Sequence, residues 1–434
     1  AMATAMVMDT AMVRTRNRRK PSFTIADPGR LVVALLVCVL IAGLLALQAL
    51  SSVSTRTAPQ LADKLLIPNG LAEEQHASQL LMAGVKTQDD VTPSAQAASP
   101  VALEAFRAEA LTPKAHAILA LAETDPGKRS RILAAATRIN RRDLLLQGLV
   151  LEEQVGAGDY VASLGTLDRL LKVHPEQQAA LFPVLMRALS QDAALPAFGE
   201  ILDGSAEWHN DFLDFAVRDK AALPALATLR SGGKLGSADF ERKLVSGLAD
   251  SGQINRAYAL FQKITGKQAA SGGAGPIDWS ADFAPFDWRF ADDGGFRAQM
   301  ARNGEKMEIY VRGGKGGIIA ERLIRAPSGR FGIRLNHRIS PADQVRDVRL
   351  QLRCAGSRDP FYDERFERGE NLFSVGSSPA GCGFLSVAIH TRAWSGRSAL
   401  RGTIDALEII KLADAPKAPA EPDTDGEEGD TDEE

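Results

Sequence analysis

The first pattern along the chain is a run of apolar residues from Leu31 to Leu50, interrupted only by Gln48. At about 1.5 Å per helical residue this run reaches about 30 Å, which is the thickness of a bilayer core. It is longer than the apolar region of a signal peptide, usually about 7–15 residues. We therefore predict an uncleaved transmembrane helix at 31–50. Two alternatives are a cleaved signal peptide, for which Ser52 and Ser54 offer a weak cleavage site, and a buried core helix.

Basic residues lie on one side of this run. Residues 1–30 carry six basic and two acidic residues, whereas the first twenty residues after the run hold only Arg56 and Lys64 as basic groups. The positive-inside rule makes 1–30 a basic cytoplasmic tail and places the rest of the chain outside the cytoplasm. Arg outnumbers Lys by 36 to 15, which is typical of a GC-rich bacterial genome. The predicted localisation is the bacterial inner membrane, with the bulk of the chain in the periplasm.

Beyond the run, the pattern is first mixed and then helical. Residues 51–100 are rich in Ser, Thr, Gln, Ala and Pro, which predicts a stalk with a short helix at 70–84. From 101 to 266, Ala and Leu recur at the three- and four-residue spacing of amphipathic helices. The turn signals in this region are Pro113, Asp125-Pro126, Asn140, Gly156 to Gly158, His174-Pro175, Gly204, Gly232-Gly233 and Ser251-Gly252. They predict short antiparallel helices that bury their faces against neighbouring pairs.

Two stretches of this helical region share a spacing. In "GDYVASLGTLDRLLKVHP" (158–175), Ser163 follows Gly158 by five positions and Pro175 follows it by seventeen. The stretch "GQINRAYALFQKITG" (252–266) repeats the opening Gly and the small residue five positions later. Both resemble the second half of a tetratricopeptide repeat, although the large aromatic and Gly-Tyr positions of its first half are absent. The resemblance implies a degenerate helical-repeat domain that offers a surface to a protein partner, with an irregular α-bundle as the alternative.

After a Gly- and Ala-rich linker at 267–277, apolar and polar residues alternate. The segments with this alternation are 306–313, 317–326, 330–339, 345–354, 383–393 and 400–412. They are punctuated by Gly, Pro and Asp, and no helical stretch separates them. We predict an antiparallel β-sandwich over 278–413. The motif "GGKGG" (313–317) lacks the spacing of a phosphate-binding loop and falls between two strands, so it predicts a hairpin turn.

Two short stretches of this region resemble the carbohydrate-binding-module type of jelly-roll. "GTIDALEI" (402–409) is similar to the closing strand of such modules, and "PFDWRF" (285–290) is similar to the opening strand with its buried Trp288. The resemblance implies a jelly-roll fold and, more weakly, a glycan ligand. The last segment, 414–434, holds ten acidic residues against one Lys. It has too little apolar area to order itself and predicts an acidic disordered tail.

The three cysteines fall in two regions. Cys38 lies in the apolar run, whereas Cys354 and Cys382 lie in the predicted sandwich. An oxidising compartment would allow a disulfide between Cys354 and Cys382. Closing that loop would contribute about 3–4 kcal/mol in the chain-entropy model. Two buried free thiols are the alternative.

The most polar insert of the sandwich region is "RDPFYDERFERGE" (358–370). Its carboxylates and aromatic rings are the groups that bind a sugar or Ca²⁺, or that act as a carboxylate pair on a glycosidic bond. Its alternating Arg and Glu also fit a solvent-facing or partner-facing loop. The candidate ligand-binding residues are Tyr362, Asp363, Glu367 and Trp394.

Several classes of chemistry have no motif in the sequence. It contains no Ser/His/Asp elbow, no CxxC and no dinucleotide fingerprint, and its six His residues are widely separated. We therefore predict no catalytic residue, no metal site and no cofactor. Between the two charged ends, residues 31–413 carry a net charge of +2, which argues against a nucleic-acid partner.

Together these patterns predict a non-enzymatic adaptor in cell-envelope work, for example in polysaccharide assembly or export. The helical repeats would bind protein, and the sandwich would bind a glycan or a second protein. The pathway rests on fold analogy alone. The main alternative is an enzyme that acts on envelope polysaccharide through Asp363 and Glu367. A third hypothesis makes the sandwich a structural cap that docks on the helices.

Overall fold

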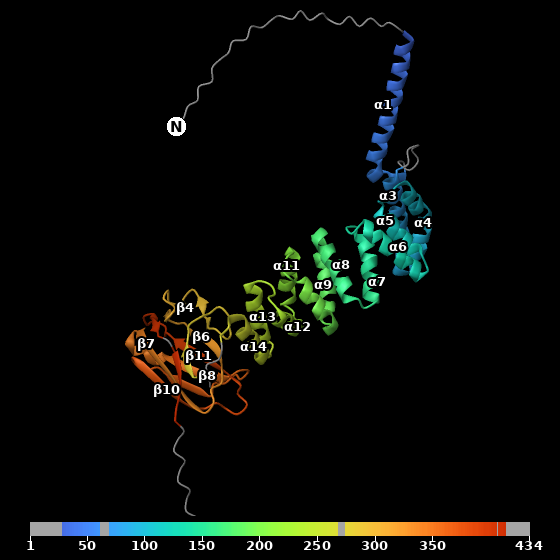
Figure 1. Cartoon of the computed structure of the whole chain (residues 1–434). Coiled ribbons are helices and arrows are strands. Elements are labelled where there is room, and N and C mark those ends of the chain that lie inside the picture. Colours follow the sequence, from blue (N-terminus) through green and yellow to red (C-terminus); the bar gives the residue numbers. More distant parts are fainter. Residues whose placement is uncertain (1–27, 61–68, 268–273, 406, 414–434) are drawn as a thin grey trace, which may run out of the picture. The chain divides into compact units, whose positions relative to one another are not determined.

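The computed structural model describes residues 28–60, 69–267, 274–405 and 407–413 (Figure 1). The predictions for the basic tail up to residue 27, for linker residues 268–273 and for the acidic tail at 414–434 lie outside these residues. The chain divides into two compact units, Ala1–Glu153 (unit 1) and Gln154–Glu434 (unit 2). The predicted fold class is confirmed: an apolar helix near the N-terminus is followed by a helical region and an antiparallel β-sandwich.

The first helix, α1, runs from Pro28 to Thr57 and contains the predicted apolar run. Its segment Gly29–Thr55 is long and apolar enough to cross a membrane, judged by length and composition. The helix continues past the predicted end at Leu50, and two threonines in this extension bond to the backbone of their own helix. The Thr55 hydroxyl donates to the Ser51 carbonyl at 2.8 Å, for example.

The segment predicted as a stalk differs in the structure, because its described part beyond α1 is mostly helical. Helices α3 (Gly70–Gly84) and α4 (Val91–Ala108) flank a short 3₁₀ turn at Gln88–Asp90, and the expected helix at 70–84 is present. The two helices pack through fully buried alanines such as Ala77, Ala98 and Ala102. Small side chains at a helix contact give a weak hydrophobic signal, which explains why the sequence resembled a linker.

Asn69 ties α3 to the end of α1. Its side-chain oxygen accepts the Ala72 N–H at 3.0 Å and so caps α3. Its side-chain nitrogen donates to the hydroxyls of Ser51 at 2.8 Å and Thr55 at 2.9 Å. These hydrogen bonds therefore hold the end of the candidate membrane helix against the start of α3.

The remaining helices of unit 1 begin at the predicted turn signals. They are α5 (Pro113–Ala122), α6 (Pro126–Ile139) and α7 (Leu144–Gly156), and the boundary between the units falls near the end of α7. Pro113 and Pro126 stand in the first turns of α5 and α6, where a missing N–H costs nothing. The Asp125 carboxylate caps α6 by accepting the Lys128 N–H at 3.0 Å.

Most helices of unit 2 are separated at the predicted turns. The helices are α8 (Tyr160–Val173), α9 (Gln178–Leu189), α10 (Leu195–Ile201), α11 (Glu207–Ala216), α12 (Leu223–Gly232), α13 (Ala238–Asp250) and α14 (Ile254–Thr265), with 3₁₀ turns at Pro175–Gln177 and Asp192–Ala194. The breaks between α9 and α10 and between α11 and α12 fall where no turn was predicted. Gly158 and Gly252 have φ values of 71° and 83°, in the left-handed region that glycine tolerates. The helical region is established, whereas its tetratricopeptide identity stays a prediction.

The sandwich of unit 2 consists of two antiparallel sheets. The strands are β1 (Gly275–Ile277), β2 (Arg289–Phe290), β3 (Asp292–Asp293), β4 (Phe296–Met300), β5 (Met307–Val311), β6 (Gly316–Arg325), β7 (Arg330–Ser340), β8 (Val348–Cys354), β9 (Tyr362–Arg365), β10 (Glu370–Ser377), β11 (Phe384–Arg392), β12 (Leu400–Ile404) and β13 (Leu407–Lys411). One sheet has the order β1-β13-β7-β12-β5-β4-β3, with β10 paired to β7, and the other has the order β2-β6-β11-β8-β9. We call them the eight-stranded and five-stranded sheets.

Alternate residues of both sheets form the core between them, as the sequence alternation predicts. Leu350 and Val387 of one sheet and Ile333 of the other are fully buried. Trp288 is buried, as the resemblance implies, and packs against Trp279 with 4.7 Å between ring centres. Every second residue therefore projects from the outer face of its sheet.

Three details of the strand prediction are corrected. The GGKGG stretch (313–317) is not a hairpin turn, because it leads from β5 of the eight-stranded sheet into β6 of the five-stranded sheet. The insert 358–370 is not a single loop, because residues 362–365 form β9 and residue 370 begins β10. Since β9 is an edge strand, its polar residues show no alternation that would reveal it. The predicted strand at 400–412 is two strands, β12 and β13, which separate near Asp405.

Candidate functional site

The predicted residues Tyr362 and Asp363 lie on β9 and face opposite ways. Asp363 is on the outer face of the five-stranded sheet, where its carboxylate accepts bonds from Arg349 at 2.6 Å and Gln351 at 3.3 Å. Tyr362 packs against the core. Burial, and then the Glu364 carboxylate, raise the pKa of Tyr362 to about 12, so its hydroxyl stays neutral. These two side chains therefore do not act on one ligand surface.

The other two predicted residues are also separated. Glu367 has an exposed side chain in the turn between β9 and β10, and its backbone is fixed by two bonds with the Asn371 side chain at 2.7 and 2.9 Å. Trp394 follows β11 and is 45% exposed, with the Arg392 guanidinium 3.8 Å from its ring centre. Of the four predicted residues, Asp363 and Trp394 belong to the outer face of the five-stranded sheet.

Two ion pairs lie on this outer face of the five-stranded sheet. Arg349 pairs with Asp363, and Arg353 pairs with Glu321 at 2.6 Å. Glu321 also accepts the Ser386 hydroxyl at 2.5 Å. The carboxylates of Asp363 and Glu321 are therefore already engaged, whereas Arg365 of β9 on the same face has no ion-pair partner among the described residues.

The predicted cysteine pair lies at one end of the same sheet. Cys354 ends β8, and Cys382 precedes β11 by two residues. The structure joins them in a disulfide, with 5.5 Å between their Cα atoms. The bond ties neighbouring strands together across the loop that carries β9 and β10.

The eight-stranded sheet carries a groove that the sequence analysis did not identify. Two rows of side chains cross its outer face in register on β4, β5, β12 and β7. The rows are Arg297, Tyr310, Arg401 and Ser340, and next to them Gln299, Glu308, Thr403 and Arg338. These residues line a groove of about 450 Å³, which we call the polar groove.

The arginines of the polar groove differ from the paired arginines of the five-stranded sheet. Arg297, Arg338 and Arg401 are exposed, and none of them has an ion-pair partner among the described residues. The guanidinium of Arg297 lies 5.7 Å from the ring centre of Tyr310. Against three cations the two rows hold one carboxylate, that of Glu308, so the groove presents net positive charge to solvent.

The groove escaped the sequence analysis because its strands are not neighbours in sequence. β12 inserts between β5 and β7, which brings residue 401 beside residues 310 and 340. The available signal was the outward position of Arg, Gln, Glu, Tyr, Ser and Thr on strands whose inward residues are apolar. That pattern gives the face of each residue, but it does not give the order of the strands.

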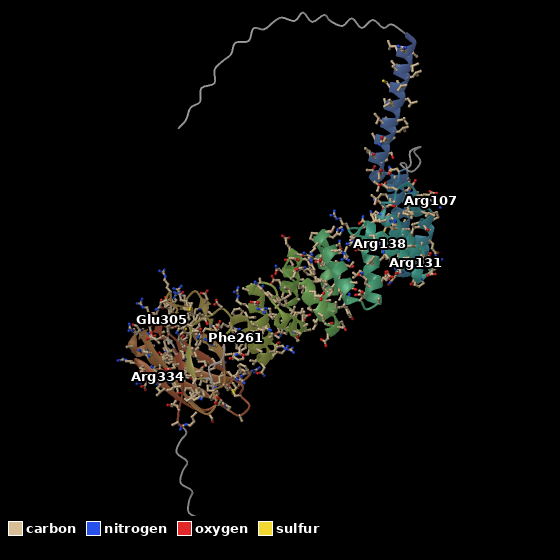
Figure 2. All side chains as sticks on the ribbon, in the orientation of Figure 1. Arg107, Arg131, Arg138, Phe261, Glu305 and Arg334 are labelled. Carbon is tan, nitrogen blue, oxygen red and sulfur yellow. A yellow bond between two sulfur atoms is a disulfide. The ribbon has the colours of Figure 1, made fainter. Side chains whose placement is uncertain are left out.

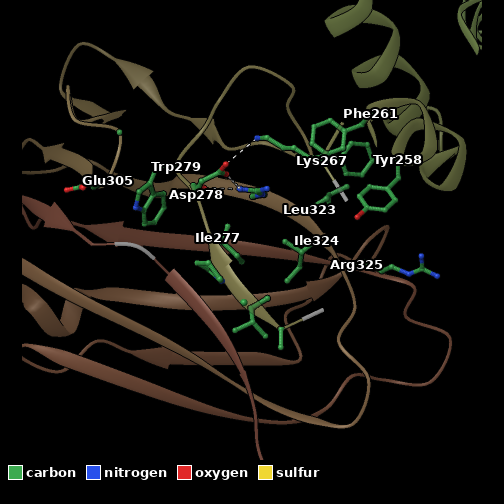
Figure 3. A pocket seen from close by; sticks show the side chains of 17 residues that line it. Tyr258, Phe261, Lys267, Ile277, Asp278, Trp279, Glu305, Leu323, Ile324 and Arg325 are labelled. Atoms are coloured by element: carbon green, nitrogen blue, oxygen red, sulfur yellow. Dashed lines mark hydrogen bonds and ion pairs between the residues drawn. The ribbon is translucent and has the colours of Figure 1, made fainter. Parts of the chain in front are cut away.

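A second hollow lies where α14 meets the sandwich within unit 2 (Figure 3). It has a volume of about 620 Å³ and is lined by Tyr258 and Phe261 of α14 and by Asp278 and Arg322 of the sandwich. The ring of Tyr258 packs against Phe286 and Phe384, each at 5.2 Å between ring centres. Aromatic contacts therefore dock the sandwich on the last helix.

A charge network reinforces this junction. Lys267, just after α14, binds the carboxylates of Asp278 at 3.3 Å and Asp287 at 3.1 Å. Arg322 donates to Asp278 at 2.8 Å. Burial alone would raise the pKa of Asp278, but the bond and charge of Arg322, with help from Ser280 and Lys267, lower it to about 2. The network ties the end of α14 to the sandwich, and each of its charged side chains has an oppositely charged partner.

Metal ligands and comparisons with known proteins complete the description of the site. Within the described parts of the chain, no three His, Cys, Asp or Glu side chains gather as a metal ion requires. No family model matches the chain. No curated protein matches it either.

Solved structures match parts of the chain at low identity. A xylanase 10C from Cellvibrio japonicus in complex with xylopentaose is 11% identical over 31% of this chain and 28% of its own, with a TM-score of 0.22. An accessory secretory protein structure from Streptococcus pneumoniae is 10% identical over 31% of this chain and 96% of its own, with a TM-score of 0.21. TmCBM61 in complex with beta-1,4-galactotriose is 12% identical over 30% of this chain and 90% of its own, with a TM-score of 0.18. The chain thus spans about a quarter of the xylanase, and similarity at this level carries no argument about ligand or reaction.

Proposed function

We propose that this protein is a membrane-anchored, non-enzymatic adaptor whose sandwich binds an acidic polysaccharide in the polar groove. The observation that carries the proposal is the set of three exposed arginines without ion-pair partners among the described residues, on three of the four strands that form the groove. Each guanidinium offers a planar fork of donors that matches a sugar carboxylate.

The other groups of the groove complement a sugar rather than a bare anion. Glu308 accepts hydrogen bonds from hydroxyl groups, and Thr403 and Ser340 both donate and accept them. Tyr310 is half-buried and supplies an aromatic surface among these polar groups. Strands in a sheet are about 4.8 Å apart, so four strands give a groove about 14 Å across. That width accommodates consecutive sugar residues of a chain.

The proposal also assigns roles to the membrane helix, the disulfide and the helical region. The candidate membrane helix would anchor the chain in a bacterial inner membrane, with its N-terminus cytoplasmic and its bulk periplasmic. The Cys354–Cys382 disulfide fits an oxidising compartment. The helical region would bind a protein of the envelope machinery. The adaptor would thereby link that protein to polysaccharide during assembly or export.

The direct experiment compares two forms of one polymer. The full chain in phosphatidylcholine nanodiscs is titrated with polygalacturonate and with the same polymer after carboxyl reduction, with empty nanodiscs as the blank. We expect binding of polygalacturonate and at least tenfold weaker binding of the reduced polymer. Absence of binding to both would contradict a glycan function, and equal binding would contradict the role of the arginines.

The enzyme alternative is tested by the same preparation. Turnover is measured as release of reducing ends from polygalacturonate by the wild type and by the double variant Asp363→Ala with Glu367→Ala. We expect no turnover in either protein, because both oxygens of Asp363 are engaged by Arg349 and Gln351. Turnover in the wild type that the folded double variant lacks would replace the adaptor hypothesis with the enzyme.

A further inference from the structure

A groove of a different character lies in unit 1, among helices α4, α5 and α6. Its volume is about 510 Å³. The lining residues are Ser99, Leu103 and Phe106 of α4, His116, Leu119 and Ala122 of α5 with the following Glu123, and Ile132, Ala135 and Ile139 of α6. We call it the apolar groove, since aliphatic and aromatic side chains form its floor and both walls.

The walls of the apolar groove expose large apolar side chains to solvent. Leu103 is 37% exposed, Phe106 is 38% exposed and Ile139 is 49% exposed. The helices already have a complete core beneath them, in which Ile118 and Leu133 are buried. The exposed side chains are thus additional to the core, and contiguous exposed apolar surface of this kind marks an interaction site.

The floor of the groove is held in place by fixed contacts. The His116 ring packs edge-on against Phe106 with 4.9 Å between ring centres, and its Nδ1 lies 2.7 Å from the Thr112 carbonyl oxygen. A floor with these contacts keeps its shape when the groove is empty. Binding to such a preformed site does not have to order the site first.

Basic residues border both walls. Arg107 follows Phe106 on α4, and Arg131 and Arg138 each precede an isoleucine of the groove on α6 (Figure 2). All three are exposed, and no ion pair with another described residue engages them. Lys128, at the start of α6, lies on the same side as Ile132, one turn before it. The lining itself contains a single carboxylate, Glu123.

We infer that the apolar groove binds an amphipathic helix of a protein partner, in which acidic residues flank the apolar stripe. The groove walls repeat at helical spacing, with Leu103 and Phe106 three apart and Ile132, Ala135 and Ile139 three and seven apart. A partner helix presents side chains at the same spacing to such a groove. The arginines on both sides select acidic flanks. A flat lipid surface would leave the concave floor unfilled.

This inference rests on the proposed adaptor function, because it names the partner surface of the helical region. It does not depend on the polar groove, which is in unit 2. Polygalacturonate binding and helix binding are therefore separate readouts of the same preparation, and failure of one leaves the other measurable.

The test uses three fluorescent synthetic peptides and the full chain in phosphatidylcholine nanodiscs. One peptide has leucines at every third and fourth position with flanking Glu, the second has the same leucines with flanking Lys, and the third is a scramble of the first. We expect the Glu-flanked peptide to bind, and the other two to bind at least tenfold more weakly. Anisotropy with empty nanodiscs corrects for partition into lipid.

Charge reversal at the rim makes the test specific. The double variant Arg131→Glu with Arg138→Glu should reverse the preference, so that the Lys-flanked peptide binds more tightly. The variant Arg187→Glu, on an exposed position of α9, should bind like the wild type. Leu103→Ser should weaken the binding of both the Glu-flanked and the Lys-flanked peptide. Circular dichroism checks that each variant folds, and their exposed positions make loss of fold unexpected.

Three outcomes would overturn the inference. The first is equal binding of the Glu-flanked and scrambled peptides. The second is unchanged binding of the Glu-flanked peptide to the charge-reversed variant. The third is binding of phosphatidylglycerol vesicles, dependent on Arg131 and Arg138, without peptide binding, which would assign the surface to the membrane.

Discussion

Two arginines on one outer face of the sandwich and two on the other are in opposite states. On the five-stranded sheet, Arg349 and Arg353 each reach a carboxylate on another strand at 2.6 Å. On the eight-stranded sheet, Arg338 and Arg401 lie on adjacent strands, and neither reaches a carboxylate among the described residues. Arg349 and Arg353 are thus engaged within the fold, whereas Arg338 and Arg401 remain available to a ligand.

The difference indicates what each face contributes. Cross-strand pairs of partly exposed charges stabilise a sheet by about 0.2–1 kcal/mol each. Aligned arginines without carboxylate partners repel one another weakly and contribute nothing to the sheet. Under the proposed function, an anionic ligand completes their hydrogen bonds. The comparison therefore predicts that variants of one face lower stability, and that variants of the other face lower binding.

The largest expected effect is on the polar groove. In the double variant Arg338→Gln with Arg401→Gln, two charged hydrogen-bonding groups are lost, each worth about 1.5 kcal/mol. Polygalacturonate affinity should fall about 100-fold, which corresponds to about 2.7 kcal/mol. Titration of the full chain in nanodiscs measures this affinity. The melting temperature of the double variant should equal that of the wild type. The matched control Arg365→Gln, on β9 of the other sheet, should bind normally. A double variant that binds like the wild type would erase the distinction between the faces.

The five-stranded sheet should respond in stability. Glu321→Ala removes the acceptor of both Arg353 and Ser386, and it leaves a partly buried guanidinium without its carboxylate. We expect a loss of about 1–2 kcal/mol in the free energy of unfolding. Urea denaturation measures the loss, and polygalacturonate affinity in the same variant should stay within twofold. Loss of binding without loss of stability would make this face the ligand site.

A third variant tests how much the edge of the polar groove contributes to binding. Arg297 lies on β4, at the end of its row, and one face of its guanidinium is directed to Tyr310. Arg297→Gln should weaken polygalacturonate binding about fivefold, or about 1 kcal/mol, which is less than the loss at the central strands. A loss of affinity larger than that of the double variant would indicate that the polymer binds closer to β4 than we propose.

The smallest expected effect is on the stability of the fold at acid pH. The pKa of Asp278 is about 2 in the folded protein, and an unpaired Asp has a pKa of about 3.9. The ionised form is therefore favoured by folding, so its stabilisation is complete above about pH 4 and is lost as the pH falls toward 2. Asp278→Asn should flatten the decline of stability between pH 4 and 2, as measured by thermal melts. The same decline of stability in the wild type and the variant would show that Arg322 does not pair with Asp278 in solution.

The sequence predicted those features that depend on local pattern. The helix of α1, the turns at Pro113, Pro126 and Gly252, and the alternation of most strands all follow from side chains within a few residues of one another. The helices over 70–108 were underestimated, because their contacts are made by alanine, whose hydrophobic signal is weak.

The sites were less predictable, because they depend on strand order. The sequence analysis selected Asp363 for its negative charge, but in the structure this carboxylate forms an ion pair with Arg349 on β8. Arg338 and Arg401 are 63 positions apart in the sequence, and their position on adjacent strands follows from the insertion of β12 between β5 and β7. Pattern analysis assigns a residue to a face, but tertiary topology decides which residues share it.

The most direct test of the central claim is protection of arginines by the ligand. The full chain in nanodiscs is treated with phenylglyoxal, with and without polygalacturonate, and each modified arginine is quantified by mass spectrometry. The account predicts that polygalacturonate protects Arg297, Arg338 and Arg401 and leaves Arg365 as reactive as before. Equal reactivity of the groove arginines with and without polymer, or protection confined to Arg365 and its face, would contradict it.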